Sequence, residues 1–364
     1  MFRLDSWKCF SKPIKRQGGL KMKRGIVLHA FWLGVVITLI GIFILPTLSC
    51  AQEKVVKLRY SNFFPSVHAI SKLSEEWCKE VEKRTGGRVK IVHFPAGTLT
   101  PPMQTYDGTV RGIADIGQAL LAYVPGRLPL SEVLSLPLGA TSGYQATKMA
   151  NEYYKKFRPK EFNDVKVMYL HCCDPGFFST KKVISSIDGI KGLRFKTNAE
   201  NVGAVRALGG AAVTMPITET YDALQKGLLD GIYLPVETLK GWKFAEVVKM
   251  TIENYGSAWA GSMFVVMNKD KWNSLSKADQ EAIETINEEW VEKQGQLWNA
   301  LSREGREYAI QKGVKFVRAS KEEEAKTAEK MKPVLAEYVK DMKSRGLPGD
   351  EALKFCLEYI KSHP

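Results

Sequence analysis

The stretch from residue 190 to residue 242 alternates short apolar runs with short helix-forming segments, and this alternation restricts the fold more than any other feature of the chain. It predicts a strand that carries Arg194 and Lys196 near its end, followed by a helix. A strand from Ala211 to Met215, a short helix and a further strand complete the stretch. Such alternation is typical of an α/β layer, in which ligands bind beyond the carboxyl ends of the strands. Lys196 lies at such an end.

The short helix of this stretch has predictable ends. Thr218 can cap its first turn, and Tyr221 and Leu224 fall on one face. Gly227 follows directly, where a left-handed residue commonly ends a helix. We therefore expect a compact strand–helix–strand unit at this point of the chain.

Three sequence blocks here form a pattern that is far more specific than a lone glycine motif. The first is Gly-Leu-Arg-Phe-Lys, which ends at Lys196, and the third is Leu234-Pro235. The middle block carries Met215, Glu219, Tyr221, Ala223, Leu224, Gln225, Gly227, Asp230 and Gly231. Together they resemble the signature of the solute-binding proteins of TRAP (tripartite ATP-independent periplasmic) transporters. That signature usually reads G-L-K-I-R, then P-M-x-x-x-E-x-Y-x-A-L-Q-x-G-x-x-D-G, then Asn-Pro.

The resemblance implies an α/β protein with a two-lobed periplasmic binding protein fold, a ligand cleft between the lobes and one long helix spanning both. The helix predicted from about Ser276 to Lys312 is the candidate for the long helix. The implied function is a receptor that captures an organic acid by lobe closure and delivers it to the membrane subunits of a TRAP transporter. A ligand-sensing protein of a signalling system with the same fold is the alternative.

The length of the chain beyond the leader, about 310 residues, suits two lobes better than one core. No Pro- or Ser-rich linker separates two halves, so we expect lobes joined by segments that cross more than once. The predicted boundaries are residues 52–173 plus 261–300 for lobe I, residues 174–260 plus 301–345 for lobe II, and residues 346–364 for a C-terminal helix.

The first 51 residues read as a secretory signal peptide. A basic segment precedes an apolar run over residues 26–45, and small residues follow before Gln52. The run of about 20 residues is long enough to span a bilayer, so an uncleaved N-terminal anchor is an alternative. Cleavage before Cys50 with lipid attachment is another. Each of these outcomes predicts an exported, periplasmic protein.

Removal of the leader halves the net charge. Residues 1–51 hold eight Lys or Arg and one acid, so the net charge falls from +14 to +7. The remaining basic residues are scattered among acids and are not clustered with aromatics, so we expect no nucleic-acid partner. A mild positive field favours anionic solutes without specifying one.

The predicted charged site depends on Lys196. In the TRAP family the last residue of the G-L-K-I-R block is an arginine that holds a carboxylate through two hydrogen bonds, and this chain has Lys196 there. Lysine keeps the charge but lacks the planar fork, so an acid can bind with less geometric selectivity. Arg194 lies two residues earlier on the same side of the strand and is a second candidate. The alternatives are a solvated or lobe-bracing lysine and a surface arginine.

The residues expected around this lysine are apolar. Leu234 replaces the asparagine of the family, and Tyr123 and Phe177 fall in segments that some members fill with polar or basic residues. A pocket with one cation and several apolar groups suits a monoacid with a hydrophobic or aromatic body better than a small dicarboxylate. Core packing is the alternative for both aromatics, and it is the expectation for Trp242 and Trp259.

The first loop after the leader supplies further candidates. Residues 62–68 follow the first strand and in such folds border the cleft, which makes Asn62, Phe63 and His68 predicted ligand-binding residues. Glu237 reads as a hinge or surface acid, with contact to the solute as the alternative. We include it among the predicted ligand-binding residues.

Motifs for catalysis and for cofactors are absent from the sequence. It contains no G-x-x-x-x-G-K-[ST], no H-E-x-x-H and no G-x-S-x-G, and its histidines lack metal-ligand spacing. We therefore predict a protein that is not an enzyme and that has no metal and no cofactor. The adjacent Cys172 and Cys173 read as small buried residues, with a strained vicinal disulfide as the alternative.

Overall fold

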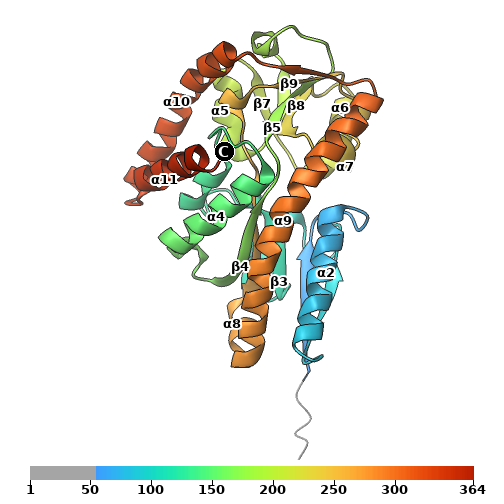
Figure 1. Cartoon of the computed structure of the whole chain (residues 1–364), viewed down its shortest axis with the longest axis vertical. Helices are drawn as coiled ribbons and strands as arrows, with labels where there is room; N and C mark the ends of the chain where they lie inside the picture. The colour runs from blue at the N-terminus through green and yellow to red at the C-terminus, as the bar shows by residue number, and fades with distance from the viewer. Residues whose placement is uncertain (1–54) are drawn as a thin grey trace, which may run out of the picture. The chain divides into compact units, whose positions relative to one another are not determined.

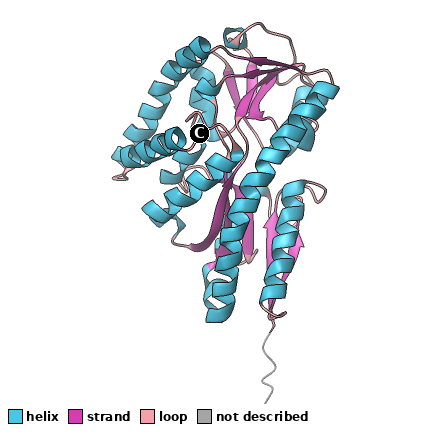
Figure 2. Ribbon diagram, viewed as in Figure 1, coloured by secondary structure: helices cyan, strands magenta, loops and turns pink. Residues whose placement is uncertain are grey.

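The computed structural model describes residues 55–364, so the predicted leader lies outside the described residues. The described part is a mixed α/β structure built on two sheets, which confirms the predicted fold class (Figures 1 and 2). Within residues 55–364, no helix has the length and apolar character needed to cross a membrane.

The first sheet forms the centre of lobe I and has the strand order β2-β1-β3-β10-β4. Its strands are β1 (Val56–Asn62), β2 (Val89–Phe94), β3 (Ile116–Leu120), β4 (Val165–Cys172) and β10 (Ser262–Asn268). β1 pairs in parallel with β2 and β3, and helices α2 (Ala69–Arg84) and α3 (Thr105–Val110) lie in the crossover connections. β10 returns from later in the chain and runs antiparallel between β3 and β4.

The second sheet forms the centre of lobe II and has the order β11-β9-β5-β8-β6-β7. Its strands are β5 (Gly176–Thr180), β6 (Arg194–Thr197), β7 (Ala211–Thr214), β8 (Gly231–Pro235), β9 (Met250–Glu253) and β11 (Lys315–Arg318). β6 pairs in parallel with β7 and β8, and the connections contain helices α5 (Val202–Ala207) and α6 (Thr220–Gln225). Residues 190–242 therefore form the predicted α/β layer, while the residue boundaries of the lobes stay a prediction.

One local prediction in this layer is wrong. Thr218 does not cap a helix, because it lies inside the 3-10 turn Ile217–Glu219, and α6 begins only at Thr220. The turn continues directly into α6, so no side chain is needed at the junction, and none donates or accepts a capping hydrogen bond there. Gly227 does take the left-handed conformation after the helix, with a φ of 75°.

The remaining helices pack around the two sheets. They are α4 (Gly143–Phe157), α7 (Thr238–Gly241), α8 (Lys269–Asn273), α9 (Lys277–Gln311), α10 (Lys321–Ser344) and α11 (Gly349–Ser362). α9 contacts α2, α4 and β4 in lobe I and α7 and β11 in lobe II, so it is the predicted long helix that spans both lobes (Figure 1). With a rise of 1.5 Å per residue it is about 50 Å long.

Buried side chains connect the lobes instead of forming two separate cores. The larger cluster includes Phe63 of lobe I, Trp298 of α9 and Phe195 of lobe II. A smaller cluster lies between α2, the first sheet and α9, and contains Trp77 and Ile283. Residues of α9 belong to both clusters. The space between the two sheets is therefore enclosed by lobe I, lobe II and α9.

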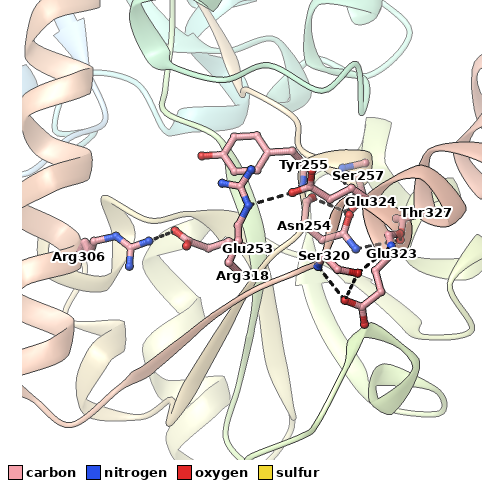
Figure 3. Close-up of polar contacts among 11 residues, drawn as sticks. Glu253, Asn254, Tyr255, Ser257, Arg306, Arg318, Ser320, Glu323, Glu324 and Thr327 are labelled. Carbon is pink, nitrogen blue, oxygen red and sulfur yellow. Dashed lines mark hydrogen bonds and ion pairs between the residues drawn. The ribbon is translucent and has the colours of Figure 1, made fainter.

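Polar contacts fasten α9 and α10 to the edge of the second sheet (Figure 3). Arg306 of α9 pairs with Glu253, the last residue of β9. Arg318, the last residue of β11, pairs with Glu324 of α10 at 3.0 Å and stacks its guanidinium on the Tyr255 ring at 4.0 Å. The Arg306 pair holds α9 against the second sheet, and the Arg318 contacts hold α10 there.

Candidate solute-binding pocket

A small cavity lies between the two sheets, and both lobes contribute to its wall. Lobe I supplies Phe63, Phe64, Leu120, Tyr123 and Met263. Lobe II and the segments that cross between the lobes supply Cys173, Lys196, Asn198, Ile217, Leu234, Glu237, Trp242 and Trp259, and α9 supplies Trp298. The structure therefore brings five predicted residues together here: Phe63, Tyr123, Lys196, Leu234 and Glu237.

Lys196 is the cationic group of this pocket. Its side chain is 1% exposed, although it extends from the third residue of β6. Its Nζ donates a hydrogen bond to Asn198 Oδ1 at 2.9 Å, which leaves two of its three donor positions for other acceptors. Burial lowers the pKa of Lys196 from 10.5 to about 7, because the charged form loses its hydration. A carboxylate placed beside Nζ would stabilise the charged form of Lys196 and accept hydrogen bonds from its two free N–H groups.

Two further polar groups lie near Lys196. The carboxylate oxygens of Glu200 are buried without a hydrogen-bond partner among the described residues, and burial raises the pKa of Glu200 to about 8. The hydroxyl of Tyr123 accepts the N–H of Ile217 at 3.4 Å, and burial raises its pKa, so it keeps its proton for donation. The pocket wall therefore offers an ammonium group and a phenol to an anion.

The rest of the wall is mainly aromatic. The Phe63 ring lies 5.5 Å from the Tyr123 ring in an edge-to-face arrangement. Phe64 lies 6.3 Å from Trp242 and 6.2 Å from Trp298, measured between ring centroids. Such rings offer flat faces and edges to an apolar or aromatic body.

A buried pair of polar side chains joins the lobes at the pocket. His68 Nε2 lies 2.7 Å from Glu237 Oε1, and both side chains are nearly inaccessible to solvent. His68 precedes α2 in lobe I, and its Nδ1 accepts the N–H of Ile70 at 3.2 Å. Glu237 follows β8 of lobe II after one residue, Val236, and directly precedes α7. The pair therefore connects the two lobes through one hydrogen bond.

Four predicted residues lie outside the pocket wall. One is His68, which contacts the wall residue Glu237. The others are Arg194, Phe177 and Asn62. Arg194 is the first residue of β6, where the strand is exposed, and it pairs with Asp230 at 2.9 Å. Lys196, two positions later, is in the buried part of the strand and lines the cavity. Phe177 packs on Tyr255 at 5.1 Å, behind the wall. Asn62 accepts the N–H of Phe64 at 2.8 Å and so shapes the loop without lining the cavity.

Several wall residues had little or no signal in the sequence. Asn198 follows Lys196 by two residues, and a period-two reading of the strand would have placed it on the same side. Trp242 and Trp259 were expected in the core, and both line the cavity. Trp259 is buried, whereas Trp242 is only partly buried and packs against the core. Trp298 lies on α9, and no local pattern indicates that this turn of the helix faces the pocket.

The cavity is small in the described conformation, with a volume of about 40 Å³. A single water needs roughly 10–15 Å³ by this measure, whereas ligand pockets have roughly 300–1,000 Å³. A small organic molecule therefore enters only when the pocket widens. Because the wall comes from both lobes, separation of the lobes is the motion that widens it.

Comparisons with known proteins identify the family of the chain. Residues 60–341 match the family described as bacterial extracellular solute-binding protein, family 7. A TRAP periplasmic solute-binding protein from Desulfovibrio salexigens is 30% identical, with 85% of this chain and 96% of that chain covered and a TM-score of 0.76.

Two other solved structures are similar to this chain and contain aromatic acids. One is a marine metagenome TRAP solute-binding protein described as specific for aromatic acid ligands, solved with 3-hydroxybenzoate; it is 27% identical, covers 85% of this chain and 99% of that chain, and has a TM-score of 0.80. The other, from Rhodoferax ferrireducens T118 with copurified benzoate, is 27% identical, with 85% and 98% covered and a TM-score of 0.79. By fold and family match, the chain belongs to the bacterial extracellular solute-binding proteins of family 7, the solute receptors of TRAP transporters.

Proposed function

We propose that the solute of this receptor is a monocarboxylate with an aromatic or otherwise hydrophobic body. The observation that carries the proposal is a single buried ammonium group, Lys196, in a wall that is otherwise mainly aromatic and aliphatic. One cation offers one strong site for a carboxylate. A second carboxylate would have to lie against apolar rings or beside Glu237, which is unfavourable in either place.

The site residues proposed for the solute follow from the pocket wall. Lys196 and the Tyr123 hydroxyl would hold the carboxylate, Phe63 and Leu234 would contact the body, and Glu237 would lie at another part of the wall. Benzoate and 3-hydroxybenzoate in two similar TRAP solute-binding proteins support an aromatic acid. In this proposal Asn62 shapes the first loop, and His68 contributes to the contact between the lobes.

The proposed partners are the membrane subunits of a TRAP transporter, and the proposed location is the periplasm. The family match to extracellular solute-binding proteins supports both. We propose that ligand binding stabilises the closed arrangement of the lobes, which the membrane subunits then recognise. The protein would act without catalysis, by binding and release.

Replacement of Lys196 by Met tests the ligand class, because Met keeps the length and removes the charge. We expect benzoate and 3-hydroxybenzoate to raise the melting temperature of the wild type and succinate to raise it less. In Lys196→Met the affinity for both aromatic acids should fall about 10- to 100-fold. This factor corresponds to the free energy of one hydrogen bond to a charged group.

Differential scanning fluorimetry and calorimetric titration measure these effects. Arg194→Met is the matched control, since it removes an exposed cation from the same strand. Equal affinities in the wild type and Lys196→Met, or a preference for succinate, would contradict the proposed function.

A further inference from the structure

The pocket wall contains an acid that the carboxylate of the solute does not explain. Glu237 is 3% exposed and lines the cavity, and its Oε1 is occupied by His68 Nε2 at 2.7 Å. Its Oε2 has no hydrogen-bond partner among the described residues. A carboxylate in this position is an acceptor that remains incompletely satisfied at the surface of the cavity.

The hydrogen bonds of His68 define which atom of the pair is the donor. His68 Nδ1 accepts the N–H of Ile70, so this nitrogen carries no proton. The proton of the neutral ring is therefore on Nε2, which donates to Glu237. Glu237 Oε1 is therefore the acceptor of this bond, and Oε2 is the oxygen left for another partner.

The surroundings of Glu237 keep it in place. Its backbone N–H donates to Asp174 Oδ2 at 3.2 Å, and burial raises the pKa of Asp174 to about 8, helped by the charge of Glu237. Gly241 lies against the carboxylate so closely that any Cβ there would come within 1.8 Å of Oε1 and 2.8 Å of His68 Nε2. Residue 241 must therefore be a glycine for the His68–Glu237 pair to lie against α7 in this way.

Glu237 and Lys196 occupy different parts of the wall. Lys196 pairs with Ile232 in the second sheet, and Glu237 follows beyond the end of β8, after the wall residues Leu234 and Pro235. Among the described ion pairs none joins Lys196 to Glu237, whose partner is His68. A solute held at Lys196 by its carboxylate therefore presents a different part of its body to Glu237.

We propose that the solute carries a hydrogen-bond donor, a hydroxyl or an amino group, away from its carboxylate, and that Glu237 Oε2 accepts this donor. The inference rests on the proposed function, because it assumes that the carboxylate of the solute lies at Lys196. A buried acceptor oxygen without a partner favours a donor and disfavours an apolar substituent of the same size, since the latter would leave this oxygen unsatisfied. Glu237 is then the residue that distinguishes hydroxy or amino aromatic acids from plain ones.

Pairs of acids that differ only in this donor test the proposal. Calorimetric titration compares 3-hydroxybenzoate with 3-methylbenzoate and 4-hydroxybenzoate with 4-methylbenzoate, because hydroxyl and methyl are similar in size. In the wild type we expect one hydroxy acid to bind about 10- to 100-fold more tightly than its methyl partner. In Glu237→Gln, which keeps the shape and an acceptor for His68, this ratio should fall to about one.

A variant of His68 separates recognition from lobe contact. His68→Ala removes the bond between the lobes but leaves the Glu237 carboxylate, so it should weaken all four acids by similar factors and preserve the ratio. Hydroxy and methyl acids that bind the wild type equally, or a ratio that survives in Glu237→Gln, would overturn the inference while leaving the proposed function intact. Failure of all four acids to bind the wild type would overturn both.

Discussion

Lys196 occupies a position where burial and charge oppose each other. The TRAP signature has an arginine here, whose guanidinium stays charged when buried. An ammonium group is a stronger point charge in water and loses more when it is desolvated, which is why the pKa of Lys196 falls to about 7. The lysine therefore makes binding of an anion depend on pH in a range where an arginine would not.

The first prediction follows from this pKa. The unliganded protein should gain stability as pH rises from about 7 towards 10.5, because the unfolded chain then binds more protons than the folded one. Affinity for benzoate should change in the opposite direction, because only the charged lysine attracts the carboxylate. It should fall by up to about tenfold per pH unit above pH 7.

Titrations at pH 6, 7 and 8 measure this dependence. Lys196→Arg is the control, since an arginine stays charged throughout this range and its affinity should change little. Glu200 and Cys173 also face Lys196, and Glu200→Gln shows how much of the dependence comes from that carboxyl. An affinity of the wild type that is constant from pH 6 to pH 8 would contradict the role of Lys196.

At the scale of elements, α9 positions the segment that carries Glu237. Gly305 of α9 lies directly against this segment: a Cβ at residue 305 would be 2.6 Å from the Val236 carbonyl oxygen and 2.9 Å from Glu237 Cα. Both atoms belong to the backbone and cannot rotate away. The glycine therefore determines how closely α9 approaches the chain segment between β8 and α7.

Gly305→Ala should destabilise the protein, although helix propensity alone favours alanine by about 1 kcal/mol. Forcing the helix from the backbone of residues 236 and 237 should reduce the free energy of unfolding by about 1–3 kcal/mol and weaken binding of aromatic acids. Denaturant unfolding and calorimetry measure the two effects. Glu307→Ala, at an exposed position on the same helix, should change neither, and a Gly305→Ala protein as stable as this control would refute the steric argument.

At the scale of the whole molecule, the small cavity implies a protein that opens to load its solute. The cavity wall includes Phe63 and Tyr123 from one lobe and Leu234 and Glu237 from the other, and the Ile217 N–H to Tyr123 bond crosses between them. A solute bound to both lobes stabilises the closed arrangement only through contacts absent from the open one. The His68–Glu237 bond joins the same two lobes directly, and it is present without solute.

Small-angle X-ray scattering should therefore detect closure. We expect benzoate to reduce the radius of gyration of the wild type and to leave that of Lys196→Met unchanged at the same concentration. His68→Ala should have a larger radius than the wild type without ligand, because a bond between the lobes is lost, and should bind benzoate up to about tenfold more weakly. Identical scattering from the wild type with and without a bound acid would rule out closure as the response.

The sequence by itself determined the family, the α/β layers, the long helix and the position of Lys196. These features depend on residues close together in the chain: a strand's side chains alternate, a helix repeats every 3.6 residues, and a motif is read in order. The burial of Lys196, the exposure of Arg194 and the place of Phe177 depended on what packs over each strand, which local patterns do not record.

Only the tertiary structure decided which side chains share the pocket. His68 and Glu237 are 169 residues apart in sequence and meet at 2.7 Å, and Trp298 reaches the same wall from α9. Each of these residues reads locally as a cap, a hinge acid or a core aromatic, and its role comes from partners brought in by the folding of two lobes against one helix. The acceptor that Glu237 contributes to the pocket wall, and hence the kind of solute we infer, comes from that packing.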